Sequence, residues 1–180
     1  MDYSIIEHKH RFASWAASRG ASTSPLCRFE VEFGKMLLEN SPLYEVAKSI
    51  DNLPSSNDFT KQHRIWRESI IQTAKEHQKE FTHGVAAKLI NLYLKSMFVC
   101  AENINDKRIQ VIHPPVDSIL LEELYRKNIG NQKQIWNKAR KTKWSKFNSI
   151  DYEEVIQAIE ISTKDTQGLW TIEKYWQGYQ

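Results

Sequence analysis

The chain has 180 residues and a formal net charge of +3 at pH 7, which is compatible with a nucleic-acid partner without requiring one. Only six glycines and five prolines are present, which disfavours a turn-rich β fold and favours helices. The two cysteines, Cys27 and Cys100, lie far apart in the sequence and exclude a disulfide framework, a zinc knuckle and an iron–sulfur cluster.

The length indicates one domain, residues 1–180, that can bury a hydrophobic core. The N-terminus lacks the basic and apolar regions of a signal peptide. No apolar run approaches the ~20 residues of a membrane span. We therefore expect a cytoplasmic monomer without a membrane partner.

Periodicity predicts a first helix over residues 8–22, with Phe12, Trp15, Ala16 and Arg19 on one face. A second helix is expected over residues 28–39, and a short amphipathic turn over residues 43–50. Their boundaries are set by turn-forming serines and prolines.

A long helix is predicted from an Asp58 cap to about Lys79, and a tight link at residues 81–84 leads into an apolar helix ending near Cys100. Five residues form the expected inner stripe of the long helix: Phe59, His63, Trp66, Ile70 and Ala74. The second helix carries one narrow polar stripe: Lys88, Asn91 and Lys95. That stripe faces water or lines a cleft.

Residues 109–112 read as a short extended piece, and Pro114-Pro115 keeps the following approach extended. Asp117 then occupies an N-cap position before an apolar helix. A basic segment rich in tryptophan begins at residue 128, and helices are expected over residues 150–162 and 168–176. The fold class is all-α, with about seven to eight helices in one compact domain.

Several familiar sites are absent from the sequence. It has no phosphate-binding glycine loop, no dinucleotide fingerprint, no nucleophile elbow and no His-Glu-x-x-His zinc motif. The one Glu-x-x-His, Glu80 to His83, lacks the partner motif of a di-iron site. We expect no metal ligands and no organic cofactor.

The turn at His83-Gly84 has the features of a phosphate site. Backbone N–H groups at the start of a helix point outward, and the helix dipole adds positive potential. Lys88 lies one turn further along, and Asp117 begins a later helix. If those helices pack together, an amine and a carboxylate meet at a cleft, where desolvation can make the amine nucleophilic.

These residues resemble the helix-hairpin-helix DNA glycosylases, particularly the 8-oxoguanine type. The family carries a Gly-Val-Gly-x-Lys hairpin and, further on, Pro-Val-Asp. This chain has Gly84-Val85-Ala86-Ala87-Lys88 and then Pro115-Val116-Asp117. The likeness covers about residues 59–124 and leaves out the basic, aromatic part over residues 128–180.

The resemblance implies a lesion-removing enzyme of base excision repair that is both a hydrolase and a lyase. Lys88 corresponds to the nucleophile that forms a Schiff base, and Asp117 to the carboxylate that assists it. His83, Gly84, Val85 and Ala86 would bind the DNA backbone, and a monovalent cation can sit at such a hairpin. A flipped damaged purine needs an aromatic face, for which we consider Trp15 and Trp170.

Two other classes of function remain open. The scaffold could bind a nucleic acid or a nucleotide without catalysis, or the chain could be a helical interaction subunit in which Lys88 and Asp117 are incidental. Damage specificity and protein partners cannot be read from the sequence.

Overall fold

The computed structural model describes residues 3–25, 27–101 and 105–179, and these residues form an all-α domain without a β-strand. The described α-helices are α1 (Ile5–Ala21), α2 (Val31–Glu39), α3 (Leu43–Val46), α4 (Phe59–Glu76), α5 (His83–Leu94), α6 (Lys107–Gln110), α7 (Ser118–Arg126), α8 (Lys133–Thr142) and α9 (Ser149–Thr163). A π-helix, η2 (Lys95–Val99), continues α5 directly.

Short 3₁₀ helices complete the described chain: η1 (Ile50–Asn52), η3 (Ile129–Asn131), η4 (Trp144–Lys146) and η5 (Leu169–Tyr175). The predicted fold class is therefore confirmed. Within the described ranges, no helix is both long enough and apolar enough to cross a membrane.

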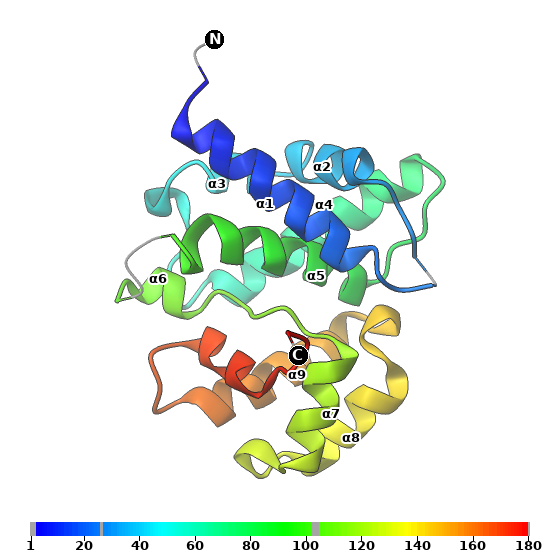
Figure 1. Ribbon diagram of the computed structural model, residues 1–180, viewed down its shortest axis with the longest axis vertical. Coiled ribbons are helices and arrows are strands. Elements are labelled where there is room, and N and C mark those ends of the chain that lie inside the picture. The colour runs from blue at the N-terminus through cyan, green and yellow to red at the C-terminus, as the bar shows by residue number, and fades with distance from the viewer. Residues whose placement is uncertain (1–2, 26, 102–104, 180) are drawn as a thin grey trace.

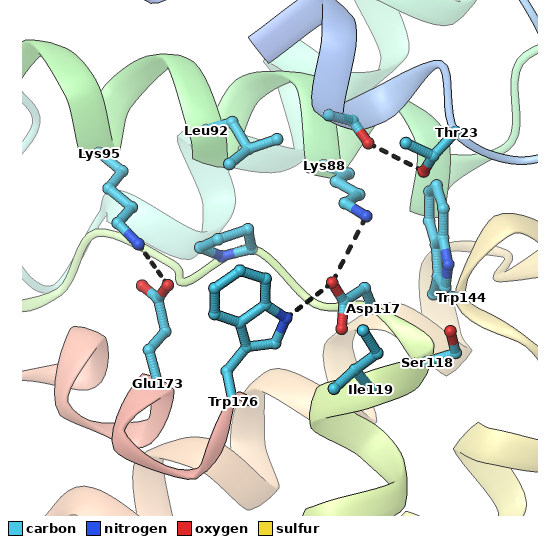
Figure 2. Close-up of a pocket in the computed structure, with 12 residues that line it drawn as sticks. Thr23, Lys88, Leu92, Lys95, Asp117, Ser118, Ile119, Trp144, Glu173 and Trp176 are labelled. Carbon is cyan, nitrogen blue, oxygen red and sulfur yellow. Dashed lines mark hydrogen bonds and ion pairs between the residues drawn. The ribbon is translucent and has the colours of Figure 1, made fainter. Parts of the chain in front are cut away.

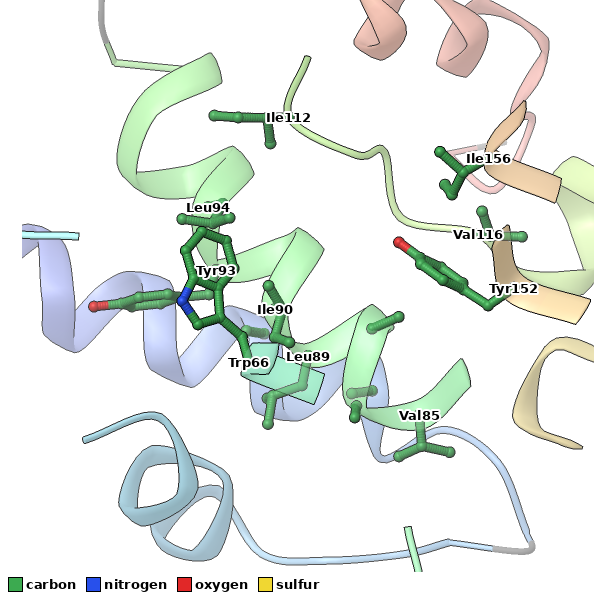
Figure 3. Packing of buried hydrophobic residues seen from close by; sticks show 14 of the residues in the cluster. Trp66, Val85, Leu89, Ile90, Tyr93, Leu94, Ile112, Val116, Tyr152 and Ile156 are labelled. Carbon is green, nitrogen blue, oxygen red and sulfur yellow. The ribbon is translucent and has the colours of Figure 1, made fainter. Parts of the chain in front are cut away.

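The helices form two groups joined by an extended segment (Figure 1). Helices α1 to α5 make one group, and α7 to α9 with η5 make the other, while the segment before α7 crosses between them. Their buried apolar side chains form one continuous core. Figure 3 shows α5 side chains such as Leu89 and Ile90 within that core, with Val116 and Tyr152 beyond them.

Helix α1 packs closely on α5 through small residues. Ala13, Ala17 and Ala21 are fully buried. A Cβ added to Gly20 would lie 2.3 Å from Leu92 Cδ1, so the glycine allows a close approach. The helix face on which the sequence places Phe12 and Trp15 points towards solvent, not towards α5. Phe12 is 60% exposed and Trp15 is 52% exposed. Small side chains therefore make up most of the buried face of α1, and His10, which is hydrogen-bonded to Tyr93 of α5, is its one large member among the described residues.

Helix α4 follows its predicted pattern. All five members of the expected stripe are buried: Phe59, His63, Trp66, Ile70 and Ala74. The helix ends at Glu76 because Gln78 adopts a left-handed conformation (φ 59°). The Gln78 and Lys79 amides then donate to the carbonyls of Lys75 and Ala74, as in a Schellman motif.

The prediction of an extended segment over residues 109–112 is wrong. Residues 107–110 form the single turn α6, because the Asp106 side chain caps it by accepting from the Arg108 amide. The extended approach to Asp117 begins only after that turn.

A buried polar network joins the two groups of helices. Asn91 Nδ2 donates to the Pro114 carbonyl at 2.9 Å and to Tyr152 Oη at 3.0 Å. Asn91 Oδ1 therefore accepts from His63 Nε2, at 2.7 Å. Tyr152 Oη, which accepts from Asn91, is also hydrogen-bonded to His113 Nδ1 at 2.9 Å. Asn91 thus fixes the backbone that leads to Asp117.

We predict that His113 makes stability sensitive to acid. Burial, and secondarily the Arg67 charge, lowers the pKa of His113 from 6.5 to about 3. Between these values the unfolded chain binds a proton that the folded protein does not. The contribution of the neutral His113 to the free energy of unfolding is therefore fully present above pH 6.5 and is lost as the pH falls towards 3. The free energy of unfolding changes by at most about 1.4 kcal/mol per pH unit through this group.

His113→Gln keeps a donor and an acceptor but cannot titrate. Urea unfolding at pH 7 and pH 5 should show a smaller difference in unfolding free energy for this variant than for the wild type. Some pH dependence will persist, because burial also lowers the pKa of His63. An unchanged difference would contradict the assignment.

Candidate functional site

The N-terminus of α5 is docked on a protein segment. Thr82 Oγ1 accepts from the Val85 amide and donates to the Ser145 carbonyl. The Gly84 amide donates to the Phe147 carbonyl at 3.2 Å. A Cβ on Gly84 would lie 1.8 Å from the Trp144 carbonyl oxygen, so only glycine permits this approach.

This docking corrects the phosphate site predicted for residues 83–86. The amides of Gly84, Val85 and Ala86 are all bonded to protein oxygens, and these three residues are buried. His83 lies with Nδ1 3.2 Å from the Arg67 guanidinium. The positive end of α5 therefore packs on residues 145–147, and the amides of Gly84, Val85 and Ala86 are not available to a DNA phosphate.

Lys88 lies on the adjacent turn of α5 in a largely apolar environment. The residue is 8% exposed, and its Nζ lies 4.2 Å from the centroid of the Trp144 ring. Nζ is 3.8 Å from Asp117 Oδ2, an ion pair beyond hydrogen-bond distance. Burial lowers the pKa of Lys88, and the Asp117 carboxylate opposes that shift.

Asp117 is held from two sides. It caps α7 as predicted, with Oδ1 accepting from the Leu120 amide at 2.9 Å. Oδ2 accepts from Trp176 Nε1 at 3.0 Å, in addition to facing Lys88. The two predicted catalytic side chains are thus brought together, and the carboxylate is held in place by both an amide and an indole.

The pair opens into a cavity of about 440 Å³ between the two groups of helices. Figure 2 shows Lys88 of α5 and Lys95 at the start of η2 entering it with Leu92 between them, opposite Asp117, Trp176 and Glu173. The wall is completed by Gly20, Thr23, Pro115, Ser118, Ile119 and Trp144. This volume is within the range of small-molecule sites, about 300–1,000 Å³.

The polar stripe of α5 is divided by the fold. Lys88 and Lys95 line the cavity, whereas Asn91 points into the buried network. Lys95 makes an ion pair with Glu173 of η5. Burial raises the pKa of Glu173, and the Lys95 charge opposes that rise.

The tryptophans of the cavity are not those predicted. Trp15 is exposed on α1 and Trp170 lies in η5, and neither lines the cavity. Trp144 and Trp176 line it instead. Trp144 stands in the basic aromatic segment that the sequence analysis singled out, but nothing in the spacing of Trp176 or Glu173 indicates that they meet Asp117 or Lys95.

Among the described residues, no group of three or more His, Cys, Asp or Glu side chains is arranged to hold a metal ion. Comparisons with protein-family models, with curated proteins and with solved structures find no match to this chain.

We predict that Gly84→Ala destabilises the protein despite the higher helix propensity of alanine. The new methyl group would collide with the Trp144 carbonyl and displace η4, at a cost of about 1–3 kcal/mol. Gly20→Ala is the matched control, because there the methyl group meets the movable end of Leu92. Urea unfolding of both variants measures the contrast, and a stabilised Gly84→Ala variant would contradict it.

We also predict that Asp117→Asn lowers the pKa of Lys88 further. The carboxylate opposes the effect of burial, so its removal leaves desolvation unopposed. Asparagine can still cap α7, which preserves the fold. Competitive acetylation across a pH series, read by mass spectrometry of the Lys88 peptide, gives the pKa; a value that stays constant or rises would overturn the prediction.

Proposed function

We propose that the protein is a DNA glycosylase and abasic-site lyase that removes a damaged purine through a Schiff base at Lys88. The observation that supports this most directly is the Lys88–Asp117 pair at 3.8 Å at the wall of an open cavity. A partly desolvated amine loses its proton more easily than a solvated one, and neutral amines are nucleophiles.

In the proposed reaction, neutral Lys88 attacks C1′ of the sugar and the bond from C1′ to the base breaks. The bonding electron pair leaves with the base, and the proton lost by the attacking nitrogen passes to the base. The nitrogen lone pair then opens the sugar ring: the C1′–O4′ bond breaks, its electron pair goes to O4′, which takes a proton from water, and an iminium ion forms. Loss of a C2′ proton then expels the 3′ phosphate by β-elimination.

Asp117 has two tasks in this scheme. Its carboxylate stabilises positive charge on the sugar as the base departs, and it then relays the proton from the attacking nitrogen to the departing base. The Leu120 amide and the Trp176 indole each donate to one of its oxygens. Both tasks benefit because the carboxylate is already oriented before the substrate enters.

Trp176 is the candidate surface for stacking of a flipped base. Its indole lines the cavity while its N–H is committed to Asp117. The Trp144 ring already makes a cation–π contact with the Lys88 ammonium, so in this proposal it positions the amine. Stacking on aromatic faces is typical of enzymes that extrude a base from a duplex.

Backbone contacts to DNA would come from lysine side chains, since the amides of Gly84, Val85 and Ala86 are occupied. Lys141, Lys143 and Lys146 are exposed in the segment that holds Trp144. Phosphate contacts of this kind weaken as salt concentration rises.

The test is borohydride trapping with two duplexes, one containing 8-oxoguanine and one an abasic site. Reduction of the iminium ion should give a stable covalent adduct with both duplexes. We expect the adduct to disappear in Lys88→Gln and to form at least about 100-fold more slowly in Asp117→Asn, the scale of acid–base assistance. Lys61→Gln, an exposed lysine of α4 outside the cavity, is the matched control and should react normally.

The other outcomes discriminate between the remaining classes. Duplex binding that weakens with salt but gives no adduct identifies a binding module and refutes the enzyme. Absence of both binding and adduct at moderate salt supports an interaction subunit.

A further inference from the structure

The cavity contains a second ion pair that the proposed chemistry does not use. Lys95 and Glu173 pair with each other at the end opposite Lys88 and Asp117 (Figure 2). The Glu173 side chain is 16% exposed and that of Lys95 33% exposed. A carboxylate and an ammonium face the same space, so this end of the cavity offers adjacent hydrogen-bond acceptors and donors.

The two pairs have a fixed relation along one helix. Lys95 follows Lys88 by seven residues, which corresponds to roughly 10 Å at the usual helical rise. Leu92 lies between the two lysines, and Trp176 between the two carboxylates. A flat ligand held against Trp176 can therefore present one end to Lys88 and the opposite end to Lys95 and Glu173.

We propose that Lys95 and Glu173 are specificity-determining residues that read the hydrogen-bonding edge of a guanine-type base. This inference rests on the proposed function, because it takes Lys88 as the sugar end of the site. With the sugar at Lys88, the edge of a purine farthest from the sugar lies towards the second pair.

The charges of the pair match one purine edge more fully than the other. A guanine-type edge presents a carbonyl oxygen followed by two adjacent N–H groups. The Lys95 ammonium can donate to that carbonyl, while the two oxygens of Glu173 accept from the two N–H groups. Hypoxanthine lacks the exocyclic amino group and leaves one carboxylate oxygen without a partner. Adenine offers a single amino group beside a ring acceptor.

Among the described residues, Lys95 is the one side chain recorded as a partner of the Glu173 carboxylate, and it bonds Oε2. The carboxylate is held in a largely buried position, where an unpaired acceptor is costly. A ligand with matching N–H groups would satisfy it, and a ligand without them would be rejected. The pair can therefore select as well as bind.

The test measures equilibrium binding of three nucleosides, 2′-deoxyguanosine, 2′-deoxyinosine and 2′-deoxyadenosine, by titration calorimetry. We expect deoxyguanosine to bind most tightly, with a preference of about 10- to 100-fold over deoxyadenosine, the scale of a bidentate base contact. Glu173→Gln and Lys95→Gln should each reduce that preference. Glu160→Gln, an exposed residue of α9 that does not line the cavity, is the matched control.

Borohydride trapping on an abasic duplex is run in parallel, because it needs Lys88 but no base. An adduct together with equal binding of the three nucleosides overturns the base-reading role and leaves the proposed function intact. A Glu173-dependent preference without any adduct supports base reading and refutes the glycosylase. If neither is observed, both proposals fail. Urea unfolding of Glu173→Gln checks separately that this variant is folded.

Discussion

The close approach between the start of α5 and residues 144–147 is the contact on which the site depends. It exists because residue 84 has no side chain and because its amide donates to the Phe147 carbonyl. The same contact places the Trp144 ring against the Lys88 ammonium. A helix N-terminus that could have bound an anion is used instead to join two parts of the fold, and the lysine one turn away becomes buried as a result.

Burial of charge then defines the cavity. Two lysines of one helical face each meet a carboxylate from the other group of helices, Lys88 with Asp117 and Lys95 with Glu173. Desolvation pulls the pKa of Lys88 down and that of Glu173 up, and in each pair the partner opposes the shift. Buried pairs of this kind add little to stability, because desolvation offsets much of the attraction. Stability alone therefore gives no reason for two such pairs at the wall of one cavity, and they are the groups on which the proposed chemistry and recognition rest.

The network around Asn91 explains how the two halves keep their register. Asn91 belongs to the same helix as Lys88 and holds the Pro114 carbonyl, three residues before Asp117. The distance between amine and carboxylate is therefore set by a buried amide as well as by apolar packing. His63, Tyr152 and His113 extend the network through α4, α9 and the linking segment. Of these side chains, His63 keeps one buried nitrogen, Nδ1, without a hydrogen-bond partner among the described residues.

Periodicity and caps determined several of the helices from the sequence, because a long apolar stripe such as that of α4 and an Asp before an apolar run leave few alternatives. They also placed Lys88 inside a helix and Asp117 at the start of one. They did not predict α6 or α8. The sequence could not show which face of α1 is buried, since that depends on small residues at a close helix crossing. Nor could it show that Trp144, Trp176 and Glu173 complete the cavity, because they come from segments far along the chain. Only the tertiary structure decided that the amides of Gly84, Val85 and Ala86 donate to protein oxygens and that Lys88 and Lys95 line the cavity.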